Sequence, residues 1–87
     1  MPKPWIASVA ADALSLLVDE MADCHAEWRE DATAVEEAYA LWSAAATDEK
    51  AARFDAYVVA LDQEEFAAEA YEAYADAVRA VAFAPVP

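Results

Sequence analysis

The residues best suited to chemistry in this sequence are carboxylates near the middle of two apolar segments, with a single histidine beside them. Carboxylates and histidine inside a helical bundle can hold two metal ions, typically through a Glu-x-x-His motif that places both ligands on one helix face. His25 and Glu27 are instead two residues apart, so their side chains would diverge by about 200° on a helix. We therefore predict no metal site and no cofactor, and interpret most of these acids as solvated residues. The residues that would be the candidate ligands of such a site are His25, Glu27, Asp31, Glu64 and Glu65, with Glu30 and Asp62 nearby.

Covalent catalysis is not indicated either. Nucleophilic catalysis needs a serine or cysteine next to a base, with a third group that fixes the base. Ser8, Ser15 and Ser43 have no histidine at helical spacing, and a chain without glycine has no glycine-rich loop for a phosphate. Cys24 is the only cysteine, which excludes an intrachain disulfide, and we interpret it as a small buried residue. We predict that the chain is not an enzyme.

A heptad pattern predicts the element that positions these residues. A hydrophobic period of 3.5 residues keeps one helix in contact with another along its whole length. Asp31 occupies one of the positions on this stripe, and the remaining positions are apolar. The sequence therefore describes a long helix that pairs with a second helix. The stripe consists of Leu14, Met21, Trp28, Val35 and Trp42, spaced seven apart, with Leu17, Cys24, Ala38 and Ala45 three residues after them.

Composition predicts an all-α fold made of one hairpin. The chain has no glycine, its prolines lie only at the two ends, and no stretch alternates with a period of two residues. We predict a single domain over 1–87, with helices over about 5–45 and 48–83 joined by a turn at 46–47. The tails, 1–4 and 84–87, are expected to be irregular. Thr47 is the predicted N-cap of the second helix, and so short a link makes the two helices antiparallel.

The second helix has a less regular stripe than the first. Glu64 interrupts it, and folding the chain at 46–47 brings Trp28 level with Glu64 and Glu65. Two capping-box patterns, 33–36 and 62–65, could instead start new helices and break the hairpin near Asp31 or Asp62. The unchanged phase of the first stripe favours unbroken helices. The second stripe comprises Phe54, Tyr57, Leu61, Ala68, Tyr71, Ala75 and Val78.

Apolar residues extend beyond these two stripes, which predicts self-association. Two helices cannot bury stripes this wide, whereas four can, and a second copy of the chain supplies the other two. We therefore predict a homodimer that forms a four-helix bundle. The additional apolar residues are Val18, Tyr39 and Leu41 on the first helix, and Val58, Ala60, Ala67, Tyr74 and Val81 on the second. The predicted interface residues are Trp28, Val35, Trp42, Tyr57, Tyr71 and Tyr74.

The charge narrows the classes of partner. A net charge of −13 disfavours direct binding to nucleic acid or to an anionic membrane. No apolar run is long enough to cross a bilayer, and the N-terminus lacks the apolar core of a secretory signal, so the cytoplasm is the expected compartment. We predict a non-enzymatic protein–protein interaction module, which is an oligomeric helical adaptor or regulator. Its partner is a protein, and the acidic surface would suit a basic one. One alternative is a nucleic-acid mimic that inhibits a basic DNA- or RNA-binding protein. A second is a carboxylate metal site in a four-helix bundle.

Overall fold

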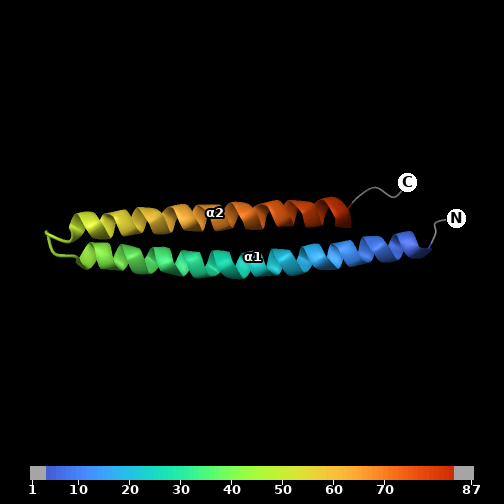
Figure 1. Cartoon of the computed structure of the whole chain (residues 1–87), viewed down its shortest axis with the longest axis horizontal. Helices are drawn as coiled ribbons and strands as arrows, with labels where there is room; N and C mark the ends of the chain where they lie inside the picture. The colour runs from blue at the N-terminus through green and yellow to red at the C-terminus, as the bar shows by residue number, and fades with distance from the viewer. Residues whose placement is uncertain (1–3, 84–87) are drawn as a thin grey trace.

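Two long helices make up this computed structural model, which describes residues 4–83 and their side chains from residue 11 onward. α1 spans Pro4–Ala44 and α2 spans Lys50–Ala82. The helices lie side by side and antiparallel, with the link at one end and both chain ends at the other (Figure 1). The predicted all-α hairpin is confirmed. The tails predicted at 1–4 and 84–87 lie outside the described residues, apart from Pro4, whose fixed φ suits the first turn of α1.

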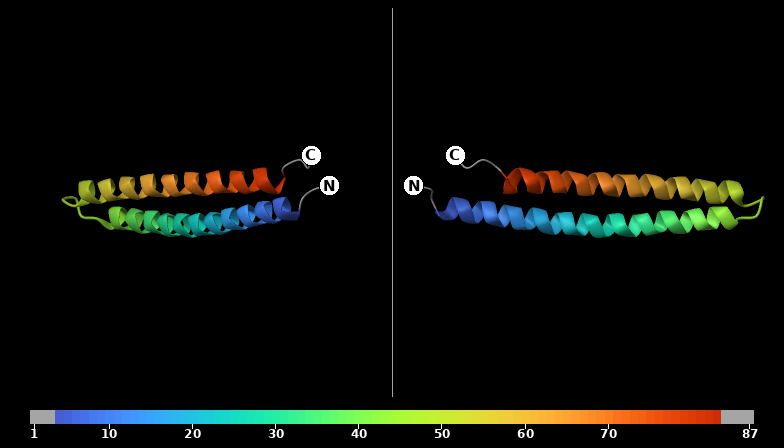
Figure 2. Two further views of the ribbon diagram at one scale, coloured as in Figure 1. Left: turned by 45° about the vertical axis from the view of Figure 1, so that its right-hand side comes forward. Right: turned by 180° about the vertical axis from the view of Figure 1, so that it is seen from behind.

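The hairpin is a thin rod. Its principal extents are 72 × 16 × 12 Å, and the two helices remain adjacent in every view (Figure 2). Because α1 has 41 residues and α2 has 33, the N-terminal end of α1 extends past α2 (Figure 1). A rod two helices wide gives every helix a large solvent-facing perimeter, which limits how much apolar surface the chain can bury.

Both helices are unbroken, as the constant phase of the first stripe predicts. α1 continues through Asp31 and α2 continues through Asp62. The hydroxyl of Thr33 donates a hydrogen bond to the carbonyl oxygen of Arg29, 3.1 Å away and four residues earlier. A threonine bonded in this way belongs to a helix interior, because an N-cap hydroxyl would accept a bond from a following backbone N–H. The capping-box pattern at 33–36 therefore starts no new helix.

The link between the helices is longer than predicted. It covers residues 45–49, and Glu49 takes the N-cap position of α2 without a side-chain capping bond, so the prediction of Thr47 as N-cap is wrong. Backbone bonds close the link from Ala45 N to the Trp42 oxygen (3.2 Å) and from Glu49 N to the Ala46 oxygen (2.9 Å). Tight helix ends commonly need a residue with positive φ, usually glycine. Residues 4–83 contain none with positive φ, so this glycine-free chain reverses over more residues.

α2 faces α1 with only part of the predicted stripe. Tyr57, Glu64, Tyr71 and Val78 of that stripe are half-buried, and Tyr57 and Tyr71 stack on the tryptophans of α1. Ala60 and Ala67, which we placed on the flank, are the most buried side chains described, each 8% exposed. Phe54 and Leu61, which we placed on the stripe, remain exposed. The physical reason is volume. α1 contributes large indole rings at Trp28 and Trp42, and small alanines across from them let the helices approach closely.

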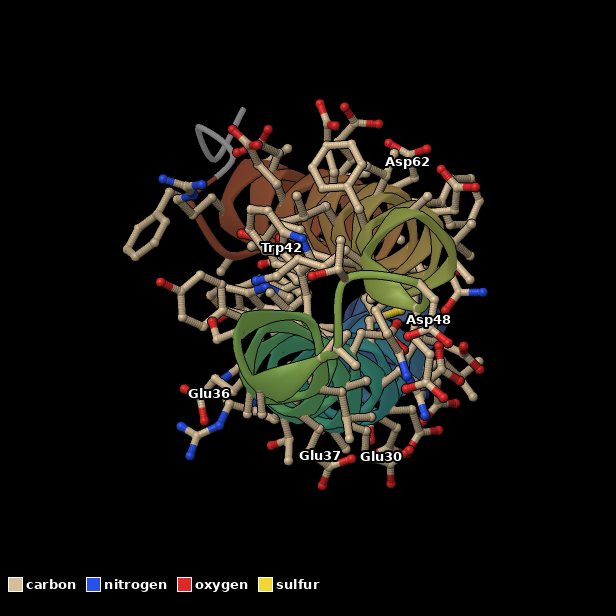
Figure 3. All side chains as sticks on the ribbon, turned by 90° about the vertical axis from the view of Figure 1, so that its left-hand side faces the viewer. Glu30, Glu36, Glu37, Trp42, Asp48 and Asp62 are labelled. Atoms are coloured by element: carbon tan, nitrogen blue, oxygen red, sulfur yellow. The ribbon has the colours of Figure 1, made fainter. Side chains whose placement is uncertain are left out.

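The outer faces of the hairpin are acidic. All eighteen acids are exposed except Asp31 and Glu64, which are half-buried. Viewed along the rod, Glu30, Glu36, Glu37 and Asp62 point outward, while Trp42 lies between the helices (Figure 3). Neither described helix holds an apolar stretch long enough to cross a bilayer.

Candidate functional site

The helices contact each other mainly through aromatic rings. Near the middle of the rod, Trp28 of α1 stacks on Tyr71 of α2, with ring centroids 5.6 Å apart and ring planes 20° from parallel. His25 lies one turn before Trp28 and meets both rings edge-on, at 5.8 Å from Trp28 and 5.2 Å from Tyr71. Each such pair contributes about 0.5–1.5 kcal/mol beyond its buried area. We name His25, Trp28 and Tyr71 the central cluster.

A second set of rings lies beside the link. Trp42 stacks on Tyr57 at 5.5 Å and 18°. Tyr39 meets these two rings edge-on, at 6.0 Å from Trp42 and 5.7 Å from Tyr57. Phe54 adds a tilted contact with Trp42 at 5.1 Å. We name Tyr39, Trp42, Phe54 and Tyr57 the link cluster; it holds the two helices together where the chain reverses.

The two clusters are the same arrangement repeated two heptads apart. Moving forward by two heptads on α1 takes Trp28 to Trp42, and moving back by the same distance on α2 takes Tyr71 to Tyr57. The stacked pair and the edge-on ring are reproduced at both places, with Tyr39 standing where His25 stands. Opposite steps on the two helices are what an antiparallel pair requires. The repeat therefore fixes the register of the hairpin at two points.

Glu64 lies between the clusters on α2, and a hydrogen bond accounts for a carboxylate in this position. The indole Nε1 of Trp28 donates to Glu64 Oε1 over 2.7 Å, between residues 36 apart in the chain. The prediction that Trp28 lies level with Glu64 is confirmed. Indole N–H can only donate and an ionised carboxylate can only accept, so the two groups satisfy each other in a partly dry site.

The five candidate metal ligands are not gathered at one place. Within the described residues, no three or more His, Cys, Asp or Glu side chains are grouped so that they could hold a metal ion. His25 packs against rings, Glu64 accepts the indole bond, and Glu27 and Glu65 are exposed. Asp31 lines a surface groove.

The groove is an open depression of about 500 Å³ on one flank of the hairpin. It is lined by Asp31 of α1 and by Val59, Asp62, Gln63 and Phe66 of α2. Val59 and Phe66 are one heptad apart, so they line up along α2, and both are strongly exposed. Neither residue was predicted from the sequence, because both lie outside the apolar stripe that was expected to face α1. The available signal was a pair of large apolar residues at heptad spacing among acids.

Cys24 is half-buried on α1. Desolvation raises the pKa of its thiol, and the carboxylates of Glu27, Glu20 and Asp23 raise the pKa further because they disfavour a second negative charge. The thiolate is the reactive form of cysteine. The raised pKa keeps the thiol protonated, and a protonated thiol is a weak nucleophile.

The predicted interface residues lie mostly inside a single chain. Trp28, Trp42, Tyr57 and Tyr71 contact one another across α1 and α2, and Val35 and Tyr74 are half-buried. What remains for other molecules is the flank beside the clusters and the groove on the other side. No protein-family model, curated protein or solved structure matches this chain.

Proposed function

We propose that this chain is a small non-enzymatic interaction module that pairs with a second copy of itself into a four-helix bundle and docks to another protein in that form. One observation carries the proposal. Within the described part of the chain, only Ala60 and Ala67 are buried, while many large apolar side chains are exposed. A domain of this size is stable when it removes large apolar groups from water. The isolated hairpin has not done so.

The accessible surface of the chain supports pairing, because it exceeds that of a compact monomer. The chain exposes 6678 Å², whereas a compact monomer of its 9.4 kDa mass would expose roughly 5,000 Å². The excess is therefore about 1,700 Å² per chain. Obligate homodimers bury about 2,000–5,000 Å² counted over both partners. Pairing two hairpins along their length would remove an area in this range.

The flank beside the link cluster supports self-pairing. Tyr39, Phe54, Val58 and Leu61 are all exposed there. Tyr39 and Phe54 both contact Trp42, which places them on one continuous surface, and Leu61 continues the line of Phe54 one heptad later. We name these four residues the aromatic flank. A mainly apolar, self-complementary face is what a two-fold symmetric interface needs.

Sedimentation equilibrium tests the pairing. We expect the mass to approach that of two chains as the concentration rises from roughly 1 to 100 μM, a range that brackets micromolar dissociation constants. Val58→Gln with Leu61→Gln should shift the protein toward monomer. Val59→Gln is the matched control, because Val59 is adjacent in sequence but points about 100° away around the helix. A strict monomer with a cooperative thermal transition would contradict the proposal.

A second candidate, supported by the exposed acids, is a nucleic-acid mimic that occupies a basic DNA- or RNA-binding protein. Nearly every carboxylate lies on the outer surface, as a mimic requires. The two functions differ in their response to salt. Binding by a mimic should weaken steeply as ionic strength rises, whereas apolar helix docking should change little. A pull-down from the native cell at low and high salt separates them.

A further inference from the structure

We infer that the groove formed by Asp31, Val59, Asp62, Gln63 and Phe66 binds a cationic amphipathic helix of a partner protein. This inference rests on the proposed function as an interaction module and names the partner class and the place where it docks. The groove lies on the other flank of α2 from Leu61, since residues 61 and 63 are about 200° apart on a helix. A chain paired through the aromatic flank would leave the groove open.

The chemistry of the lining selects the occupant. Val59 and Phe66 supply an apolar floor, and Phe66 is 76% exposed, an unusual position for a phenylalanine with no partner. The lining also holds two carboxylates, Asp31 from α1 and Asp62 from α2, and no lining residue is basic. Asp55 and Glu69, one heptad either side of Asp62, are also exposed and extend the row of carboxylates along α2. An occupant therefore needs apolar residues that face Val59 and Phe66, with cations beside them that reach the carboxylates.

The spacing of the floor favours a helical occupant. Val59 and Phe66 are seven residues apart, which is about 10.5 Å along α2. A helix with apolar side chains at positions i, i+3 or i+4, and i+7 presents the same repeat along one face. Laid along the hairpin, it would become a third helix with its apolar face on Val59 and Phe66. Lysines or arginines flanking that face would reach Asp31 and Asp62. Viewed along the rod, Asp62 lies on the opposite side from Glu36, so the groove and the Glu36 side are separate surfaces (Figure 3).

Fluorescence anisotropy with a labelled synthetic peptide tests the inference. The probe is a leucine–lysine peptide of about 15 residues, near the shortest length that forms a helix alone, with leucine at helical spacing. A scrambled peptide of the same composition is the first control. We expect the patterned peptide to bind the full chain at least about tenfold more tightly than the scrambled one, a difference of roughly 1.4 kcal/mol.

Two matched pairs of variants locate the site. Phe66→Ala should weaken peptide binding about tenfold, whereas Phe83→Ala should not, although Phe83 is equally exposed at 80%. Asp31→Asn with Asp62→Asn should weaken binding and flatten its salt dependence more than Glu36→Gln with Glu72→Gln, which removes the same charge elsewhere. Circular dichroism confirms that each variant remains helical.

The outcomes separate this inference from the proposed function. Equal binding of the scrambled peptide, or equal effects of Phe66→Ala and Phe83→Ala, would overturn the groove and show only general attraction of cations to an acidic chain. Sedimentation of the same samples reports pairing independently. A monomer that still binds the patterned peptide through Phe66 would keep the groove and reject the dimer. A dimer that binds both peptides equally would keep the proposed pairing and reject the groove as a docking site.

Discussion

Trp28 on α1 and Glu64 on α2 are joined by a 2.7 Å hydrogen bond from the indole Nε1 to a carboxylate oxygen. The bond places the carboxylate of Glu64 against the central cluster and gives this half-buried acceptor a hydrogen-bond donor. Truncating either residue would leave the other polar group unpaired in a partly dry site. The pair therefore sets register as well as contributing stability, because a slip of one heptad would separate the two groups.

Trp28→Phe should lower the free energy of unfolding by about 1–2 kcal/mol, the lower part of the range for a hydrogen bond to a charged group, since the site is half-buried. The phenyl ring is smaller than the indole, so the loss combines the missing N–H donor with some packing against Tyr71. Urea denaturation followed by circular dichroism measures the loss. Protomer concentration must be held constant, because self-association would otherwise alter the apparent stability.

Glu64→Leu provides the complementary test. In the native chain this change should destabilise, since it leaves the Trp28 indole N–H without its acceptor. In the Trp28→Phe background it should stabilise, because an apolar pair then replaces an unpaired carboxylate. A double-mutant cycle should give a coupling energy of about 0.5–1.5 kcal/mol. If the two changes simply add, the hydrogen bond contributes nothing measurable.

Ala60→Leu and Ala67→Leu should each cost about 1–3 kcal/mol, because a larger side chain cannot enter a close helix contact without moving the helices apart. Ala73→Leu is the matched control on the same helix, since Ala73 is exposed and both residues form helices well. Melting temperatures by circular dichroism compare the three. Equal melting temperatures for Ala60→Leu and Ala73→Leu would show that the face of α2 is assigned incorrectly.

The face of α1 could be predicted from the sequence because its pattern has one solution. Large residues recur at seven-residue spacing from Leu14 to Trp42, and no competing stripe of similar size runs beside it. The Trp28–Glu64 level followed from folding the chain near its midpoint. This part survived the error at Thr47 because the observed link, 45–49, is centred within one residue of the predicted turn at 46–47.

The face of α2 could be predicted only in part. Alanines at 60 and 67 lie beside larger apolar residues at 54 and 61, so two neighbouring lines are both apolar. Hydrophobicity alone favours the line that contains Phe54 and Leu61, because these side chains have more apolar surface to bury. The structure keeps Tyr57 and Tyr71 of the predicted stripe but turns Ala60 and Ala67 inward in place of Phe54 and Leu61, because the tryptophans of α1 already fill the contact. That choice depends on both helices at once and is not visible in either segment alone. The groove was missed for the same reason, since its floor is defined only once α2 has its orientation.

Trp42→Ala should destabilise the hairpin by about 2–4 kcal/mol, somewhat below the usual cost for a buried tryptophan because Trp42 is only half-buried. The loss should be concentrated near the link, where Trp42 contacts three other rings. Hydrogen exchange should show faster exchange around residues 39–57 than in the native chain, with less change near the central cluster. Tyr39→Ala removes only the edge-on ring and should cost clearly less. Uniform acceleration of exchange would contradict a separate role for the link cluster.

Cys24 gives a prediction about alkaline pH. Partial burial and the carboxylates of Glu27, Glu20 and Asp23 raise the pKa of its thiol in the folded chain. The unfolded chain therefore loses the thiol proton first as pH rises. The stabilising contribution is fully present below the ordinary thiol pKa of about 8.5 and is lost as pH climbs through the raised folded value. Below that window the protonated thiol should also react slowly.

The stability of the native chain should accordingly fall more between pH 8 and 10 than that of Cys24→Ala, which lacks the thiol and is otherwise unchanged. Urea denaturation at each pH measures the two slopes, and their difference isolates the thiol. Alkylation with iodoacetamide near pH 7.5 gives an independent reading, with a rate in the folded chain well below the rate in urea. Parallel slopes for the two proteins, together with equal alkylation rates, would mean that Cys24 is as solvated when folded as when unfolded, and that the carboxylates around it do not act on the thiol.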